Sequence, residues 1–273
     1  MIAAAAAKED PLCKPWKATW SKKHHPQLAQ YNHKADRSWM PRLLKLGLLA
    51  LGHASYHVTV TPPNAPPKGS EKARFGGDVL ARKVVLKAIV PIEVISILGL
   101  LIPTLYQAAT TLALLPPSDL IYSSSATQHF NSLPKPFLAG IVLQLLAGII
   151  RLSCYRALGR LFTFELSIRT EHKLVTSGPY SIVRHPSYVG TFCAQTGMLL
   201  CTFGPGGWLY EAGWMSSGVM RTAAVMLGTW VVYLLTGMVR RTSSEDRMLK
   251  REFGKEWDMW ARRVPYKMIP GVF

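Results

Sequence analysis

The sequence predicts an all-α, polytopic integral membrane protein with about five transmembrane helices and a cytosolic, amphipathic C-terminal helix. Three observations predict this class. Hydrophobic residues make up 49% of the 273 residues and charged residues only 17%, whereas a soluble domain usually carries about 25% charged residues. The apolar residues gather in runs of about the length that crosses a bilayer. Basic residues, which give the chain a net charge of +17, flank these runs.

The placement of the basic residues predicts the lipid bilayer as a partner. Lys and Arg residues that flank apolar runs contact anionic headgroups and set the topology of the chain. The sequence contains no motif that is typical of RNA- or DNA-binding domains. We therefore expect no nucleic-acid partner, despite the high positive charge.

The chain begins with a polar, basic segment and two interrupted apolar runs. We expect an N-terminal arm at 1–40 and a membrane domain at 41–273. The run 43–60 is a marginal span because Lys45 and two histidines interrupt it. The run 84–115 is too long for one upright helix and too short for two. Its prolines favour a tilted or kinked span.

Three further apolar runs follow. The run 136–155 contains Arg151 near its end, where we expect the side chain to reach back to the headgroups. The runs 188–203 and 222–239 are separated by the sequence "GPGG". A break of this kind between two apolar runs predicts an antiparallel hairpin.

Beyond Arg240 the sequence changes character. Apolar residues recur there at spacings of three and four, with Lys and Arg opposite, which predicts a helix that lies on the membrane surface. The apolar positions are Leu249, Phe253, Trp257, Trp260 and Val264.

Lys and Arg are concentrated in three segments that join or follow the apolar runs. The positive-inside rule places these segments in the cytosol. The loops 116–134 and 203–217 contain no Lys or Arg. A spanning first run would put the basic arm on the opposite side, so the side of the arm stays open. The basic segments are 61–83 with five such residues, 151–185 with six and 240–273 with nine.

Two polar clusters lie at the predicted cytosolic side, at 171–188 and 240–246. An antiparallel hairpin would bring both clusters to one membrane face. Pro186 disfavours helix at His185 and predicts a turn there. Polar turns between membrane helices need partners for their backbone groups, and a polar ligand would supply them. A satisfied structural histidine is the alternative interpretation.

Within the second cluster, Arg241 and Glu245 are four residues apart and would share one face of a helix. A surface ion pair explains the same spacing and contributes only about 0.3–0.5 kcal/mol. The spacing alone therefore does not decide between a site and an exposed pair.

Three motifs occur in order: "HKLVTSGPYSIVRHPSYVG", "RTSSED" and "FGKEWDMWARRVP". Together they resemble the isoprenylcysteine carboxyl methyltransferases, over roughly 161–273. The resemblance implies a multi-pass enzyme of the endoplasmic reticulum membrane, with its active site facing the cytosol and its cofactor site within 160–273. It also implies S-adenosyl-L-methionine as the cofactor and the C-terminal carboxylate of a prenylated cysteine in proteins as the acceptor.

The same resemblance implies roles for single residues. Arg241 would hold the substrate carboxylate. The family often has two glutamates where this chain has Glu245 and Asp246. The implied cofactor-binding residues are Glu165, His172, Lys173, Leu174, Val175, Tyr180, His185, Pro186, Ser187, Tyr188 and Glu245.

The implied reaction needs no general base. A C-terminal carboxylate has a pKa of about 3.5 and is ionised near pH 7. Its attack on a sulfonium methyl group cancels two charges, which a dry site favours. We therefore expect the rate to vary little between about pH 6 and 8. No metal ion is needed, and the four cysteines suit neither a zinc site nor a disulfide framework.

Other functions remain open at this point. A phospholipid or other small-lipid methyltransferase would share the cofactor site and differ in the lipid pocket. A catalytically silent membrane relative would keep the fold and act by binding. Sterol reductases carry similar Arg-His-Pro elements, but we would expect a longer chain with more spans.

Overall fold

The computed structural model describes residues 39–65, 133–164, 173–211 and 213–273. The chain divides into two units, 1–44 and 45–273. Within the first unit only 39–44 are described, and they form the first turns of a helix. All further description concerns the second unit. The predicted arm at 1–40 therefore stays a prediction.

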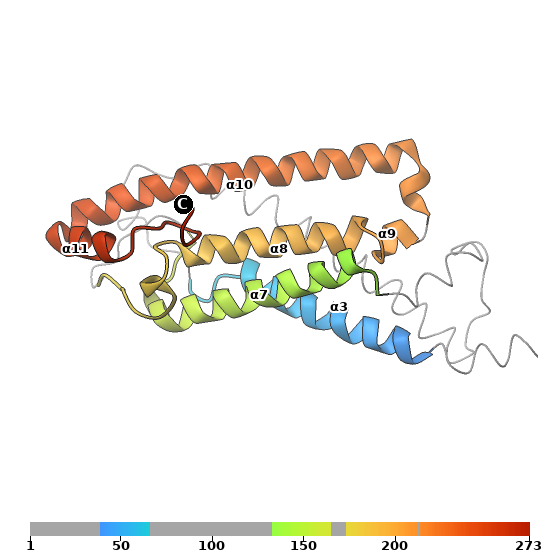
Figure 1. Cartoon of the computed structure of the whole chain (residues 1–273), viewed down its shortest axis with the longest axis horizontal. Helices are drawn as coiled ribbons and strands as arrows, with labels where there is room; N and C mark the ends of the chain where they lie inside the picture. Colours follow the sequence, from blue (N-terminus) through green and yellow to red (C-terminus); the bar gives the residue numbers. More distant parts are fainter. Residues whose placement is uncertain (1–38, 66–132, 165–172, 212) are drawn as a thin grey trace, which may run out of the picture. The chain divides into compact units, whose positions relative to one another are not determined.

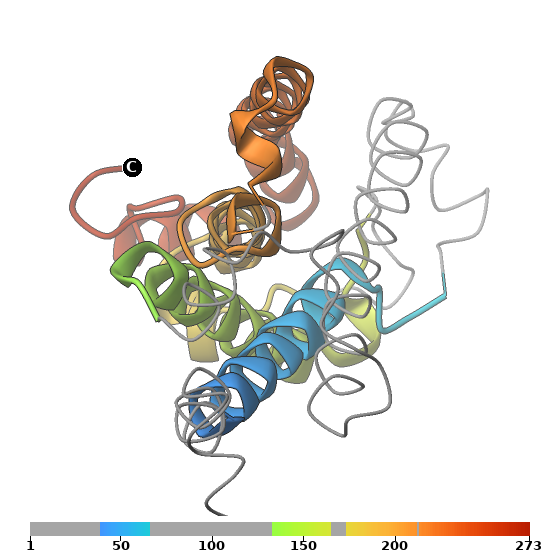
Figure 2. The same cartoon turned by 90° about the vertical axis from the view of Figure 1, so that its right-hand side faces the viewer.

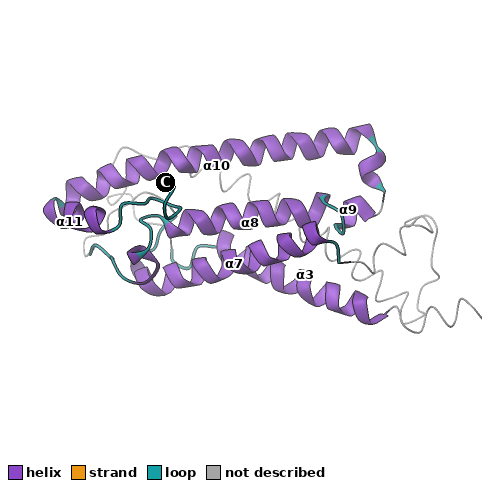
Figure 3. Cartoon of the chain, viewed as in Figure 1, coloured by secondary structure: helices purple, strands orange, loops and turns teal. Residues whose placement is uncertain are grey.

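The described residues form helices and turns without a strand, as Figure 3 shows. The all-α prediction is confirmed for these residues. The longer helices are α3 Trp39–Val60, α7 Lys135–Leu158, α8 Pro186–Phe203, α10 Gly218–Phe253 and α11 Lys255–Arg263. Short elements between them are η2 Gly159–Leu161, η3 Gly178–Ser181, α9 Trp208–Glu211 and η4 Trp214–Ser216.

α7 and α8 lie side by side (Figure 1), and two glycines make their close contact possible. A Cβ atom on Gly140 of α7 would lie 2.9 Å from the carbonyl oxygen of Gly197. A Cβ atom on Gly197 of α8 would lie 2.6 Å from the carbonyl oxygen of Gly140. Small residues allow helix backbones to approach in this way in membrane proteins.

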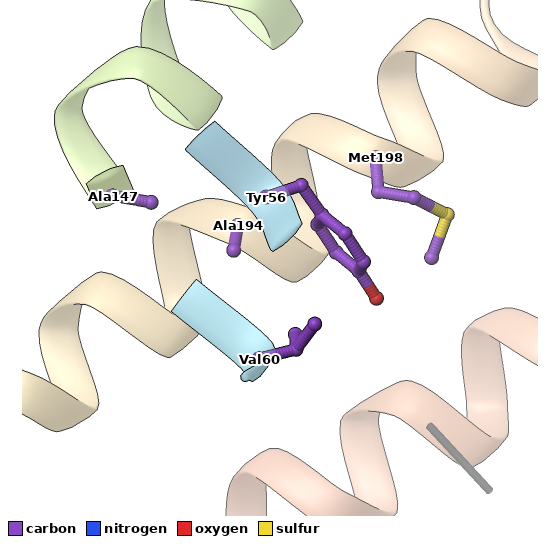
Figure 4. Close-up of a cluster of buried hydrophobic side chains, with 5 residues drawn as sticks. All are labelled: Tyr56, Val60, Ala147, Ala194 and Met198. Atoms are coloured by element: carbon purple, nitrogen blue, oxygen red, sulfur yellow. The ribbon is translucent and has the colours of Figure 1, made fainter. Parts of the chain in front are cut away.

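α3 packs against α7 by the same means (Figure 2). A Cβ atom on Gly148 of α7 would lie 2.8 Å from the Cβ of Ser55. A small apolar cluster then joins α3 and α7 to α8 (Figure 4). Its members are Tyr56, Val60, Ala147, Ala194 and Met198.

α8 and α10 run in opposite directions, as the sequence predicts (Figure 1). The connection between them contains α9 and η4. Tyr188 in the first turn of α8 and His185 just before it form hydrogen bonds with the last third of α10. The predicted hairpin is therefore confirmed, and it brings the two polar clusters together.

α10 does not end where the fifth apolar run ends. The helix continues without a break through 240–253 and stops only at Gly254, whose φ of 51° favours glycine. The predicted surface helix is thus the end of α10 followed by α11. Its apolar face packs inside the protein because residues far away in sequence cover it: Trp260 and Val264 are buried beside Cys154, Phe162 and Tyr180.

Within the described residues, two helices are long and apolar enough to cross a membrane, Lys135–Leu161 and Gly218–Phe253. α3 and α8 cover the first and fourth predicted runs as helices without reaching that criterion. The second run, 84–115, lies outside the described residues. The count of five spans therefore stays a prediction. What the described residues show is an all-helical fold with two helices of membrane-spanning length and hydropathy.

Candidate functional site

The site begins at the turn that precedes α8. η3 is followed by Arg184 and by His185, the residue before the first turn of α8. The φ and ψ of His185 are −126° and 58°, so it is not helical. Pro186 is the first residue of α8 and imposes this boundary, as the sequence predicts. The turn directs the imidazole of His185 toward α10.

His185 lies between two carboxylates of α10. Its Nε2 is 2.9 Å from Oδ1 of Asp246, and its Nδ1 is 3.5 Å from Oε2 of Glu245. The hydroxyl of Tyr188 donates a hydrogen bond to the same oxygen, Oε2 of Glu245, at 2.9 Å. The two polar clusters that the sequence places at one membrane face therefore meet in direct contact.

The charge of this imidazole follows from its neighbours. Burial disfavours the charged ring, but the carboxylates of Asp246 and Glu245 outweigh this cost and raise the pKa of His185 to about 9. The ring is thus an imidazolium near pH 7, with a proton on each nitrogen. Both nitrogens can then donate toward a carboxylate.

The two acids differ in exposure. The side chain of Asp246 is 11% exposed and that of Glu245 is 29% exposed. The hydrogen bond from Tyr188 and the ion pair with His185 both end on Oε2 of Glu245. Glu245 is therefore the acid that can reach a ligand through Oε1, whereas Asp246 is turned into the protein.

Arg184 connects the C-terminal segment to this turn by hydrogen bonds, a role that was not predicted from the sequence. Its Nη1 donates to the carbonyl oxygens of Val264 and Pro265 at 3.1 Å, and its Nη2 donates to Asp246 at 3.2 Å. The backbone N–H groups of Arg184 and His185 also donate to the carbonyls of residues 266 and 267. The tail thus forms one wall of the site.

Arg151 lies inside the protein, so the expectation that it reaches back to the headgroups is wrong. It is 6% exposed, and it donates to Ser187 at 3.0 Å and to Thr191 at 2.9 Å. Ser187 and Thr191 are four residues apart on α8 and share one face, which is the signal the sequence offered. Aromatic rings cover the guanidinium at 5.0–6.0 Å: Phe164, Phe162 and Tyr155.

Arg241 lies one helical turn before Glu245 on α10. Its side chain reaches the residues that follow α7 and η2. Its guanidinium donates to the carbonyl oxygen of Phe164. The ring of Phe164 also lies 5.0 Å from the guanidinium carbon of Arg151. Arg241 and Glu245 therefore border the same region of the protein.

The comparisons with known proteins match the region that holds this turn. Residues 140–208 match the model of the isoprenylcysteine carboxyl methyltransferase family. This segment is similar to that family. The match includes α8, most of α7 and the Arg-His-Pro turn, and it ends before α10. It starts upstream of the resemblance noted in the sequence, which begins near Leu161.

Two individual relatives are named as methyltransferases of this kind. Protein-S-isoprenylcysteine O-methyltransferase B of Arabidopsis thaliana is 30% identical over 128 residues, which is 46% of this chain and 55% of that protein. A probable protein-S-isoprenylcysteine O-methyltransferase of Oryza sativa subsp. indica is 28% identical over 129 residues, 46% of this chain and 56% of that protein. The chain thus spans about half the length of these methyltransferases.

A relative with a different name shares less of its length. A probable 7-dehydrocholesterol reductase of Acanthamoeba polyphaga mimivirus is 28% identical over 102 residues, 37% of this chain and 19% of that protein. No solved structure matches the chain. The methyltransferase relatives therefore share a larger part of their own length with this chain than the reductase does.

The remaining residues implied by the family resemblance fall into three groups. Pro186 begins α8, and Ser187 accepts the hydrogen bond from Arg151. Tyr180 is buried in the apolar cluster, where burial raises the pKa of its phenol. Leu174 and Val175 pack against that cluster, and Lys173 is exposed. Glu165 and His172 lie outside the described residues.

Proposed function

We propose that the protein transfers a methyl group from S-adenosylmethionine to the C-terminal carboxylate of a prenylated cysteine in proteins. The observation that carries this proposal is the contact of the Arg-His-Pro turn with Glu245, one turn from Arg241, in a chain whose segment 140–208 matches the model of the methyltransferase family. We further propose that the enzyme is multi-pass in the endoplasmic reticulum membrane, with this site facing the cytosol.

The chemistry of the donor set fits the cofactor. S-adenosylmethionine supplies, when bound, a methyl group on a positively charged sulfur. Glu245 offers Oε1 to a cationic or hydroxyl-bearing ligand, and Tyr188 and His185 hold its other oxygen. Residues 172–175, Tyr180 and Glu165 are proposed as further cofactor contacts on the basis of the resemblance alone.

The acceptor carboxylate is proposed to bind Arg241. A guanidinium can donate to both carboxylate oxygens through its planar fork, which orients the anion as well as attracting it. The carboxylate is ionised without help near pH 7, so His185 need not act as a base. Its raised pKa fits this, because an imidazolium has no free lone pair to accept a proton.

The prenyl group is proposed to approach through the bilayer. The apolar side chains of α10 are largely exposed in the described residues, including Val225, Met226 and Val232. A lipid-linked acceptor can reach the end of this helix without leaving the membrane. A water-soluble carboxylate would lack this route and would have to compete from solution.

The test is methyl transfer from labelled S-adenosylmethionine in membranes that contain the protein, with farnesyl-cysteine and a phospholipid offered as separate acceptors. Transfer to farnesyl-cysteine that is lost in Arg241→Ala, with cofactor binding kept, supports the proposal. Transfer to phospholipid alone replaces the substrate and keeps the cofactor. Cofactor binding without transfer to either acceptor indicates a silent relative.

Equal loss of cofactor binding and of transfer in Arg241→Ala would contradict the role of Arg241 in substrate binding. Arg240→Ala serves as the matched control because Arg240 is the preceding residue of the same helix and is exposed. We expect this variant to keep most of the activity.

A further inference from the structure

The acid next to Glu245 has a different set of partners. The side chain of Asp246 is 11% exposed, whereas that of Asp258 in the same tail is 40% exposed. Oδ1 of Asp246 is 2.9 Å from Nε2 of His185, and Oδ2 accepts from Arg184 at 3.2 Å. Nζ of Lys267 lies 4.0 Å from Oδ2. Asp246 is therefore surrounded by cations of its own chain.

This arrangement fixes the orientation of the imidazole ring. Because Asp246 binds Nε2, the opposite nitrogen of His185 faces Glu245. The backbone N–H of His185 also donates to the carbonyl of Lys267 at 2.7 Å, so both the main chain and the ring are held. The ring cannot turn toward another partner without breaking the bond to Asp246.

The position of Glu245 depends on this ring in turn. One oxygen of Glu245, Oε2, accepts the hydrogen bond from the Tyr188 hydroxyl and forms the ion pair with His185. Holding that oxygen directs the other, Oε1, away from the ring. An acid whose side chain is partly exposed would otherwise sample several rotamers, and ordering it on binding would cost conformational entropy.

We propose that Asp246 is a positioning residue for the proposed methyl transfer: it orients His185, and His185 holds Glu245 so that Oε1 is presented to S-adenosylmethionine. This inference rests on the proposed function. It assigns different roles to two adjacent acids, one facing the ligand and the other facing the protein. Arg184 and Lys267 contact the same carboxylate and tie the C-terminal segment to the network.

The test uses the full-length, detergent-solubilised protein and three variants. Asp246→Asn removes the charge at nearly constant size, and Asp246→Glu keeps the charge. Asp258→Asn is the matched control, because Asp258 forms an exposed ion pair with Lys250 at 2.8 Å. The measured quantities are the Kd of S-adenosylmethionine, the KM of farnesyl-cysteine and the titration of the His185 ring by NMR.

We expect Asp246→Asn to raise the Kd of S-adenosylmethionine about tenfold, the scale of one charge-assisted hydrogen bond. The KM of farnesyl-cysteine should stay near the wild-type value. The His185 ring should titrate at lower pH without ligand, because it then faces Glu245 alone, with Tyr188, Arg184 and Lys267 unchanged. Asp246→Glu should restore a large part of both effects, and Asp258→Asn should change neither.

Two results would overturn the proposal. One is a folded Asp246→Asn protein with the wild-type Kd, which would leave the proposed function intact. The other is a wild-type protein in which binding of S-adenosylmethionine leaves the His185 titration unchanged, since a cation at Glu245 must compete with the imidazolium and lower its titration point. This second measurement needs no variant. A wild-type protein that binds no S-adenosylmethionine would overturn the function and the inference together.

Discussion

The hydroxyl of Tyr188 donates a 2.9 Å hydrogen bond to Oε2 of Glu245. This bond joins the first turn of α8 to α10, between residues that are 57 positions apart. It adds a neutral donor to the contact that His185 makes with the same oxygen. Glu245 is thus held by two residues of the segment 140–208 that matches the family model, although Glu245 lies beyond that segment.

Removing this donor should weaken cofactor binding. We expect Tyr188→Phe to raise the Kd of S-adenosylmethionine about tenfold, because a hydrogen bond to a charged group contributes about 1.5–3 kcal/mol. Isothermal calorimetry on the solubilised protein measures this. Tyr233→Phe on the exposed face of α10 is the control and should leave the Kd unchanged. A tenfold change in both variants would mean that the effect is not local to Glu245.

The charge of His185 should make stability depend on pH. The pKa of His185 is raised from 6.5 to about 9 in the folded protein. The group therefore contributes stability that is fully present below about pH 6.5 and is lost as pH rises through about 9. The contribution is up to about 3 kcal/mol. The thermal midpoint of the wild-type protein should fall over this window, and that of His185→Gln should fall less.

The charge of His185 also affects how the rate of the proposed methyl transfer depends on pH. From about pH 6 to 8 the His185 ring stays charged, so the expected rate of methyl transfer varies little there. Above about pH 9 the rate should decline as Glu245 loses its charged partner. A steep rise between pH 6 and 8 in the wild-type enzyme would instead indicate a general base, and the proposed direct attack by the ionised carboxylate would be wrong.

The buried Arg151 should not tolerate lysine. A lysine ammonium cannot place two donors on Ser187 and Thr191 in the planar geometry of the guanidinium, and it covers less of the aromatic rings. We expect Arg151→Lys to lower the free energy of unfolding by about 1–3 kcal/mol. Arg156→Lys, on an exposed position of the same helix, should change it by less than about 0.5 kcal/mol. Chemical denaturation in mild detergent provides the comparison.

The contact between α7 and α8 should depend on Gly197. A side chain there would meet the carbonyl of Gly140 and the side chain of Gln144 at under 3 Å. Gly197→Leu should therefore lower the free energy of unfolding by about 1–3 kcal/mol. Gly237 on α10 has open space around it, so Gly237→Ala should be neutral or stabilise by up to about 1 kcal/mol. Equal destabilisation by both would show that helix contact is not the cause.

Some of these features could be predicted from local patterns. Pro186 after His185 predicts a turn, and two apolar runs around "GPGG" predict a hairpin, so the meeting of His185 with Glu245 follows from the sequence. The continuation of α10 to Phe253 did not follow, because a change from apolar to polar residues marks a change of surroundings and not the end of a helix.

Other features depend on residues far apart in sequence. The partners of Arg151 come from α8, and the partner of Arg184 at the carbonyl of Val264 lies 80 positions away. The pattern of charges around Arg151 is equally compatible with a side chain that reaches the headgroups. The different contacts of Glu245 and Asp246 could not be predicted from the sequence either. Adjacent residues of a helix point about 100° apart, and the sequence does not show which of the two acids faces His185 and Arg184.

The length of α10 has a consequence for which molecules could serve as the proposed acceptor. Its 36 residues rise about 54 Å, well beyond the roughly 30 Å of bilayer hydrocarbon. With the apolar stretch 222–239 inside the hydrocarbon, Glu245 lies only about 9 Å past the last apolar residue, at headgroup depth. The unbroken helix fixes that depth. A carboxylate anchored by a short lipid tether arrives at this height, whereas one on a long flexible tether spends most of its time further out in the water.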